Sequence, residues 1–308
     1  MATEKRPGRQ PAETLKPIFQ KLTTEPAEGF AFKRIRATGF GCPWHVHPEY
    51  ELILVLQSDG YRIVGDNIAP LTAGDLVFVG PGLPHIWQNE PSARDGGEVQ
   101  VLLIQFEERF LGDGLLRLPA LEPIRRLLRS AARGLHVVGP TRDSASALFI
   151  AMADSTGFRR IVQFLELLEL LANSLDCHPI ASRGFAVDSP AFDQERMNRV
   201  FQLISRDLGQ GIRLSKVARS VGLSDRAFSR FFRLHAGMTF PEFLNELRIG
   251  RACRLLIEDE KPISEICYEC GYANLSNFNR QFLRLRALSP GAFRQQMQRR
   301  LRAAQAPG

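Results

Sequence analysis

Four residues in the N-terminal half combine the side chains that commonly bind transition metals. His45 and His47 are separated by one residue, Glu51 follows after three more, and His85 lies further along the chain. Imidazole nitrogens together with a carboxylate suit divalent iron, manganese, zinc or nickel. The same groups can instead hydrogen-bond a sugar-like molecule without a metal, or satisfy one another and water as an inert cluster. The residues alone leave these three interpretations open.

Short apolar runs surround these four residues and predict the strands that would position them. The runs read ELILVL, YRIV, DLVFV and VQVLLIQF, with turn residues between them. Such a pattern is typical of a β-sandwich or barrel. Residues two apart on a strand share a face, so we expect His45, His47 and Glu51 to point inward from one strand.

Two segments then resemble the paired sequence motifs of the cupin fold. They are GFGCPWHVHPEYE, which begins at Gly39, and GDLVFVGPGLPHIWQN, in which Gly80 stands where the motif usually has proline. The resemblance implies a cupin-like effector-binding domain over residues 21–114. It also implies that the three histidines and the glutamate converge inside a small β-barrel, as the ligands of a divalent metal where one is bound.

Four aromatic residues lie close to these motifs, namely Trp44, Tyr50, Tyr61 and Trp87. Aromatic faces stack well on sugar rings, and aromatic side chains also commonly fill barrel cores. We therefore predict that Trp44 and Trp87 contact an effector together with His45, His47, Glu51 and His85, with core packing as the alternative.

The C-terminal third contains a weak internal duplication, with copies at 212–232 and 262–282. Each copy reads as a short helix, a turn at glycine (Gly222, Gly271) and a second, basic helix. Glycine adopts the left-handed backbone of a tight turn at no steric cost. The pattern is that of the helix-turn-helix, and two copies joined by a long helix predict two DNA-reading units.

The helical period divides each second helix into a buried side and a side free for DNA. Phenylalanines recur on the inner side, and Ser224 and Asn274 are placed to cap the helix starts. Arginine can bind guanine and asparagine can bind adenine through paired hydrogen bonds. The predicted DNA-binding residues are Arg226, Ser229, Arg230, Arg233, Ser276, Asn277, Arg280 and Arg284.

The charge distribution agrees with DNA binding. The chain carries a net charge of +7, and residues 195–302 hold 20 of its 40 basic but only 10 of its 33 acidic residues. The excess of positive charge therefore lies in the C-terminal third, as expected for a domain that neutralises phosphates.

This region resembles the DNA-binding domain of the AraC/XylS family of bacterial transcription regulators, from the first turn through PEFLNELRIGRACRLL to the closing SPGAFR. The resemblance implies a DNA-binding domain over 193–308 whose second helices enter successive major-groove segments of double-stranded DNA. It also implies a small-molecule effector, a homodimer and, for an activator, contact with RNA polymerase. The segment LRLRALSP departs from the family pattern and leaves the end of the second reading helix open.

Residues 115–192 are predicted to form helices and then a linker. The run RRIVQFLELLELLANSLD is apolar around most of its circumference, so it either packs on the barrel or forms a dimerisation helix, which we favour. Residues 178–189 read as the interdomain linker, and residues 1–20 as a disordered tail.

Bulk properties restrict the class of protein. The chain has no run of 18 apolar residues, and its N-terminus has no apolar signal segment. Five cysteines make no disulfide framework, and Cys267 and Cys270 are interpreted as core residues rather than a metal site. These features predict a cytoplasmic protein without membrane contact.

Together the patterns predict an α+β protein: a cupin-like β-barrel, a helical segment and an all-α domain with two helix-turn-helix units. We interpret it as a sequence-specific transcription regulator, an activator controlled by a small polar effector such as a sugar, and not an enzyme. The alternative is a metal-dependent cupin enzyme fused to a DNA-binding domain. It is disfavoured because no other general base or nucleophile constellation accompanies the cluster.

Overall fold

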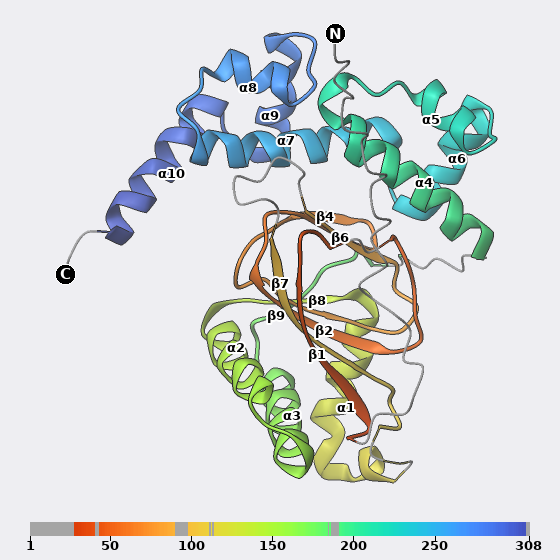
Figure 1. Cartoon of the computed structure of the whole chain (residues 1–308), viewed down its shortest axis with the longest axis vertical. Coiled ribbons are helices and arrows are strands. Elements are labelled where there is room, and N and C mark those ends of the chain that lie inside the picture. Colours follow the sequence, from red (N-terminus) through yellow and green to blue (C-terminus); the bar gives the residue numbers. More distant parts are fainter. Residues whose placement is uncertain are drawn as a thin grey trace, which may run out of the picture.

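A β-barrel built from two antiparallel sheets occupies the centre of the protein (Figure 1). The computed structural model describes residues 28–40, 43–89, 98–110, 112, 114–183, 185 and 191–305, so the predicted tail at 1–20 lies outside the described residues. The larger sheet has the order β1 (Phe30–Ala37), β7 (Val99–Phe106), β2 (Tyr50–Gln57), β5 (Leu76–Val79), β8 (Leu135–Val137) and β9 (Cys177–Pro179). The smaller sheet has the order β4 (Asn67–Leu71), β3 (Gly60–Val64) and β6 (His85–Asn89).

The central strands are apolar on both faces because both faces of the larger sheet are covered. On β2, Ile53 and Val55 point into the barrel interior, where they pack with Trp87. Leu52 and Leu54 of the same strand point the other way and pack beneath helices. This two-sided burial explains why the strand sequences read as continuous apolar runs rather than alternating ones.

Three helices cover the outer face of the larger sheet: α1 (Glu122–Ser130), α2 (Gly139–Ala153) and α3 (Gly157–Ala172). The inner side of α3 buries Phe164, Leu167, Leu168 and Leu171 against the sheet and α2. Figure 1 shows these helices beside the barrel, away from the helical domain that caps its other end. Packing on the barrel, left open as one interpretation of this helix, therefore accounts for one of its faces.

The prediction that 115–192 is a helical segment followed by a linker is incomplete, because β8 and β9 both lie within it. Each has three residues, too few to show a period-two pattern. The pair extends the barrel sheet through β5, where Leu76 is opposite Val137. Long-range pairing, rather than local preference, creates these strands.

The C-terminal domain consists of helices, as predicted. They are α4 (Ala191–Asp207), α5 (Leu214–Ser220), α6 (Asp225–Ala236), α7 (Phe240–Glu258), α8 (Ile263–Glu269), α9 (Leu275–Arg286) and α10 (Pro290–Gln305). Helices α5 and α6 form the first helix-turn-helix unit, α8 and α9 form the second, and α7 joins them (Figure 1). The two turn glycines have φ of 70° at Gly222 and 80° at Gly271, in the left-handed region.

Local side-chain bonds fix the starts of α6 and α9, the second helix of each unit. The Ser224 side chain accepts a hydrogen bond from the Ala227 amide, and the Asn274 side chain accepts one from the Asn277 amide. The end of α9, which the sequence left open, lies at Arg286, and Ala287 takes the left-handed position with φ of 55°. None of the described helices is long and apolar enough to cross a lipid bilayer.

Candidate DNA interface and effector site

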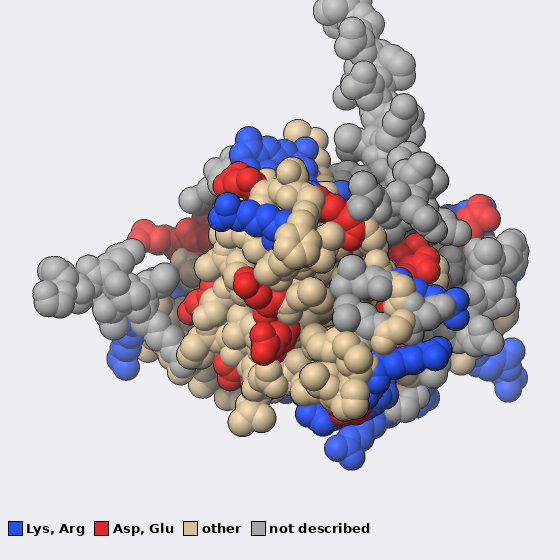
Figure 2. Space-filling model, turned by 90° about the horizontal axis from the view of Figure 1, so that it is seen from below, with Lys and Arg blue, Asp and Glu red and all other residues tan. Residues whose placement is uncertain are grey.

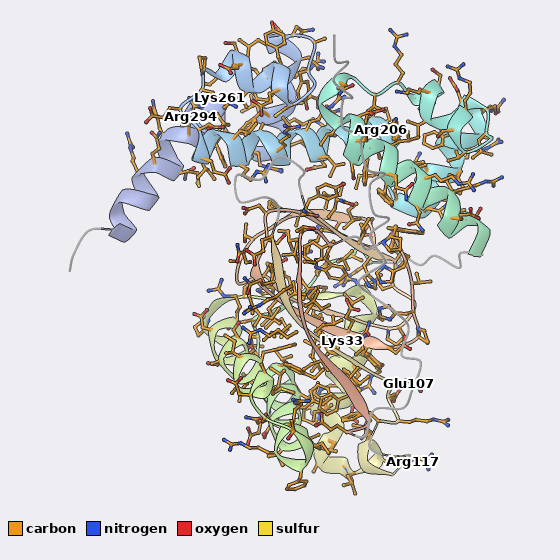
Figure 3. All side chains as sticks on the ribbon, viewed as in Figure 1. Lys33, Glu107, Arg117, Arg206, Lys261 and Arg294 are labelled. Atoms are coloured by element: carbon orange, nitrogen blue, oxygen red, sulfur yellow. The ribbon has the colours of Figure 1, made fainter. Side chains whose placement is uncertain are left out.

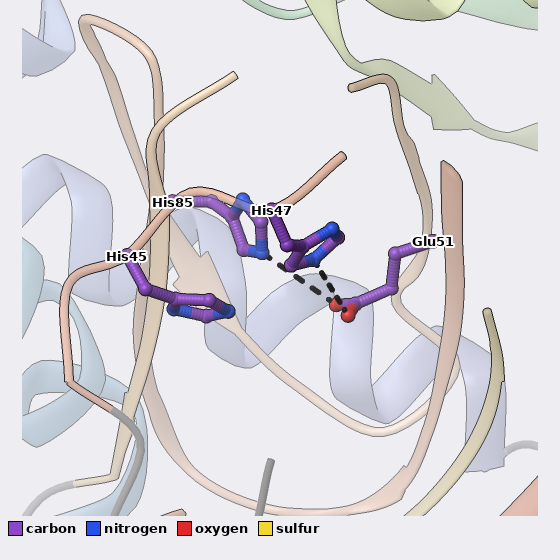
Figure 4. Close-up of side chains that lie close together, drawn as sticks. All are labelled: His45, His47, Glu51 and His85. Atoms are coloured by element: carbon purple, nitrogen blue, oxygen red, sulfur yellow. Dashed lines mark hydrogen bonds and ion pairs between the residues drawn. The ribbon is translucent and has the colours of Figure 1, made fainter. Parts of the chain in front are cut away.

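The three histidines and the glutamate converge at one side of the barrel interior (Figure 4). Their ligand atoms all lie within 4.8 Å of one another. His45 pairs with His85 of β6 through two backbone hydrogen bonds of 3.1 and 3.0 Å, and Glu51 projects from β2. The expected single strand through His45 and His47 is wrong: His47 lies in the loop before β2, and a tertiary bridge orients His45 instead.

Backbone carbonyls hold all three imidazole rings by the same nitrogen. The backbone oxygens of Pro43 and Glu49 lie 2.8 Å from His45 Nδ1 and 3.0 Å from His47 Nδ1. The backbone oxygen of Leu83 lies 2.7 Å from His85 Nδ1. A carbonyl oxygen only accepts, so each Nδ1 must donate its hydrogen. In the neutral ring, Nε2 then carries a lone pair, which is the tautomer that binds metals. Burial lowers the pKa of His47, but its hydrogen bond to Glu51 and the nearby carboxylates outweigh this and raise it, so without a metal the protonated ring donates from Nε2 to Glu51.

Glu51 supplies a buried negative charge to the same site. Its side chain is fully buried, its Oε2 lies 3.2 Å from His47 Nε2, and it accepts a 2.8 Å hydrogen bond from Gln105. Burial raises the pKa of Glu51, but the hydrogen bond from protonated His47 and the attraction of the neighbouring imidazoles as they gain protons at low pH outweigh it and lower the pKa to about 2. The carboxylate is therefore ionised at neutral pH. The ammonium of Lys33, a residue labelled in Figure 3, donates to Gln105 Oε1 at 3.3 Å and so supports the carboxylate through that amide.

Two ligand atoms in this cluster remain without a hydrogen-bond partner in the described part of the chain. They are Glu51 Oε1 and His85 Nε2, which are fully buried and 3.8 Å apart. Burial lowers the pKa of His85 well below its usual value, so its ring is neutral. A buried anion beside inward lone pairs calls for a cation, and the donor set fits a divalent transition metal.

The two tryptophans named as effector contacts lie in different places. Trp87 belongs to the barrel core, with its ring centroid 4.9 Å from that of His85, and its Nε1 has no hydrogen-bond partner in the described structure. Trp44 packs outside the barrel, with ring centroids 6.2 Å from Phe201 and 6.3 Å from His235. Its geometry therefore suits a domain contact better than the predicted effector contact.

The two tyrosines are also occupied elsewhere. Tyr50 stacks on Phe106 at 5.1 Å beneath the covering helices, and the Tyr61 hydroxyl lies 3.4 Å from Ser205 in α4. Tyr61, Ile63 and Ile86 join Trp44 on the surface that the barrel presents to the first helix-turn-helix unit.

The first reading helix, α6, exposes the side predicted to face DNA. Phe228 and Phe232 are fully buried, whereas Arg226, Ser229, Arg230 and Arg233 are exposed. The Ser229 hydroxyl donates to a backbone carbonyl one helical turn earlier. The arginines are therefore the polar groups of this helix with the greatest reach.

The second reading helix, α9, exposes a similar polar side, on which side chains of the helix hydrogen-bond to one another. Ser276, Arg280 and Arg284 are exposed, whereas Asn277 is half-buried. The Arg280 guanidinium donates to Asn277 Oδ1 at 2.9 Å, and Arg284 donates to Gln281 at 3.0 Å. Asn277 is thus placed to orient Arg280.

Asn279 is an exposed polar residue of α9 that the sequence analysis missed. The duplication itself contains the signal, because Phe228 and Phe278 are equivalent at a spacing of 50 residues. The same spacing matches Ser229 with Asn279 and Arg230 with Arg280. An asparagine at this position adds a group that can pair with adenine.

Comparisons with known proteins match both regions of the chain. Residues 217–296 match the family described as a helix-turn-helix domain, and residues 34–95 match the cupin domain family. The transcriptional activator RhaR of Klebsiella pneumoniae is 26% identical over 253 residues, which are 82% of this chain and 86% of the relative. The activator RhaS of Salmonella schwarzengrund is 22% identical over 82% of this chain and 87% of its own length.

Solved structures give more distant likenesses. An AraC-type regulator from Chromobacterium violaceum is 25% identical with a TM-score of 0.32, covering 35% of this chain and 96% of that one. ToxT from Vibrio cholerae is 12% identical with a TM-score of 0.34, covering 86% of this chain and 97% of its own.

Proposed function

The chain is a DNA-binding transcription regulator of the AraC/XylS family, and from that premise we propose that it activates transcription in response to a small polar effector bound in its barrel. One observation carries the proposal. Trp44 directly precedes His45 of the polar cluster in the sequence. Its side chain packs into the core of the first helix-turn-helix unit. A ligand that moves His45 therefore acts directly on the placement of a DNA-reading helix.

The exposed sides of α6 and α9 would each enter a major-groove segment. Arg226, Arg230 and Arg280 are the base-reading candidates, because arginine reaches furthest and pairs with guanine through two hydrogen bonds. Arg233 and Arg284, near the helix ends, are suited to phosphates. The described surface of each unit thus offers both specific and charge-based contacts.

A divalent metal would be held by His45, His47, Glu51 and His85. When bound, it would supply a coordination site for hydroxyl or carboxylate oxygens of the effector. The chain's own part is to fix the three rings through their Nδ1 hydrogens and to keep Glu51 ionised. The relatives' names, transcriptional activators RhaR and RhaS, make a sugar the first effector class to test.

Dimerisation through the outer side of α2 and α3 completes the proposal. Phe158 is 80% exposed, and Val162 and Ile150 are exposed on the same helix pair, although α3 already packs on the barrel by its other side. Figure 2 looks onto this end of the molecule and shows charged side chains of both signs separated by uncharged areas. We assign a second copy of this chain to the exposed side of α2 and α3. The resulting dimer would read two half-sites of the DNA in the cytoplasm.

The alternative of a cupin enzyme fused to a DNA-binding domain has weaker support. The relatives matched over four-fifths of the chain are named transcriptional activators. For an activator, RNA polymerase is the further partner.

Elemental analysis of the purified chain tests the effector site. We expect about one equivalent of a transition metal per chain in the wild type and a loss in both His47→Ala and Glu51→Ala. His178→Ala, which removes an exposed histidine outside the cluster, should retain the metal. A metal-free wild type after growth with added metal would leave a purely polar effector pocket.

Selection of bound duplexes from a random DNA library tests the regulator itself. The full chain should enrich one motif with two segments, and a panel of sugars should change its affinity. Failure to enrich any motif would contradict sequence-specific regulation. If a motif is enriched but no sugar changes the affinity for it, the chain is still a sequence-specific regulator and a sugar is rejected as its effector.

A further inference from the structure

A groove on the barrel wall, away from the histidine cluster, has the features of an anion site. Its volume is about 510 Å³, and it lies between the β3–β5 region and the segment that leads from β8 into α2. Arg62, Arg142, His136 and His178 all border it. Two arginines and two histidines around one groove indicate a ligand with several oxygen acceptors.

Arg62 is the buried cationic side chain in the lining of this groove. It is only 3% exposed, and its Nε donates to Asp75 Oδ2 at 2.9 Å. Its buried Nη1 has no hydrogen-bond partner among the described residues. A buried charged donor without an acceptor is costly, so the arrangement favours a ligand oxygen at the guanidinium.

Asp75 does not accept hydrogen bonds from all the donors that line the groove. One of its oxygens accepts from Arg62, and the other lies 3.0 Å from His136 Nε2. Asp75 thus engages the Nε edge of the Arg62 guanidinium with one oxygen and the His136 ring with the other. The carboxylate holds Arg62 and His136 in place and leaves their remaining donors for a second anion.

The other wall carries Arg142 and His178. His178 is opposite His136 in the β8–β9 register, and Arg142 lies in the first turn of α2, where it pairs with the exposed Asp143. The start of α2 is already capped by Asp176, which accepts from Thr141. The groove would therefore hold an anion through side chains and not through the helix end.

We propose that this groove binds the phosphate group of a small phosphorylated metabolite. Arginine forks match phosphate oxygens, and the imidazoles add single donors from other directions. The groove is larger than a phosphate ion and falls within the size range of small-molecule sites, about 300–1,000 Å³. The remainder of the metabolite would lie along Ala69, Pro70 and Thr72 of the opposite wall.

The location couples the groove to the DNA-binding domain. Ile180, which borders it, donates to the Gly134 carbonyl at 2.9 Å and begins the segment toward α4. Ala69 and Pro70 of β4 also border a second cavity of about 610 Å³ that faces α7 and the second unit. An effect of the ligand on DNA affinity rests on the proposed function, whereas binding itself does not.

Calorimetric titration of the full chain tests the proposal with glucose 6-phosphate, inorganic phosphate and glucose as probes. We expect the phosphate ester to bind, glucose not to bind, and Arg142→Gln and His178→Gln each to weaken binding about tenfold. His178 is exposed and Arg142 is half-buried with 42% of its side chain exposed, so these variants should fold. Arg159→Gln, an exposed arginine on α3 outside the groove, is the matched control.

Each outcome decides the assignment. Equal binding of inorganic phosphate and the ester, lost in the groove variants, would support the site and identify free phosphate as its ligand. Binding that the groove variants leave unchanged, or no binding of either phosphate probe at about 10 mM, would overturn the site. Loss of DNA response with intact phosphate binding would contradict only the proposed regulation.

Discussion

The two helix-turn-helix units have similar sequences but different attachments to the barrel. The first shares a hydrophobic cluster with it, in which Trp44, Ile63 and Ile86 pack with Phe201 and Phe232. The second has a cluster of its own, built in the described structure from residues of α7 to α10 and their connections. Between it and β4 lies the cavity of about 610 Å³.

This difference indicates unequal roles for the two units. The first unit is fixed to the barrel by side chains excluded from water, so its position follows that of the barrel. The second unit is held through α7, and we expect its position relative to the barrel to respond to a ligand in the cavity. The duplicated motif would then provide one docked helix and one adjustable helix.

The largest expected effect is that of Trp44→Ala. Removal of a fully buried indole typically costs about 3–5 kcal/mol, and here the loss falls on a cluster shared by two domains. Hydrogen exchange should increase in both β3 and α6. Phe282→Ala, a loss of similar size in the second unit, should increase exchange only around α7 to α9. Equal exchange changes in the barrel for both variants would contradict the asymmetry.

Gly237→Ala should undock the first unit at a smaller cost. Gly237 ends α6 with φ of 69°, and an added Cβ would lie 2.4 Å from Asp66 Cβ of the barrel. Gly222 has φ of 70° but open space around it, so Gly222→Ala incurs the same backbone strain, about 1 kcal/mol, without the clash. Thermal unfolding should show a larger loss for Gly237→Ala, and equal losses would indicate that the contact adjusts freely.

Arg230→Ala and Arg280→Ala should each weaken binding to the selected DNA by about 1–3 kcal/mol and relax specificity at one position. The effector should change the contribution of Arg280 more than that of Arg230, because Arg286 at the end of α9 borders the cavity, whereas no described residue of α5 or α6 does. Fluorescence anisotropy with matched and single-mismatch duplexes measures both effects. Arg159→Ala should have no effect, and unchanged discrimination in both reading-helix variants would refute the assignment.

The smallest effect compares the ends of the two reading helices. Helix α6 is followed by the cap residue Gly237, whereas α9 is followed by Ala287, a non-glycine residue with φ of 55°. Ala287→Gly should therefore stabilise the protein by about 0.5–1 kcal/mol, seen as a higher urea midpoint. Ala273→Gly, at a position without positive φ, should not stabilise it; a gain in that variant too would remove this explanation.

The sequence by itself determined the features that depend on neighbouring residues. Ser224 and Asn274 cap helices, and Gly222 and Gly271 turn the chain, because each acts within a few residues of its own position. The duplication and the cupin-like motifs also indicated the α+β fold, since periodicity and motif spacing are local properties.

Only the tertiary structure decided the features that depend on distant segments. His45 is oriented by its bridge to His85, not by a strand shared with His47. Trp44 lies outside the barrel interior and contacts α4 and α6. Strand β8 forms by pairing with β5, and β9 forms by pairing with β8. Local spacing cannot encode these outcomes, because each depends on which surfaces meet when the chain buries its apolar faces.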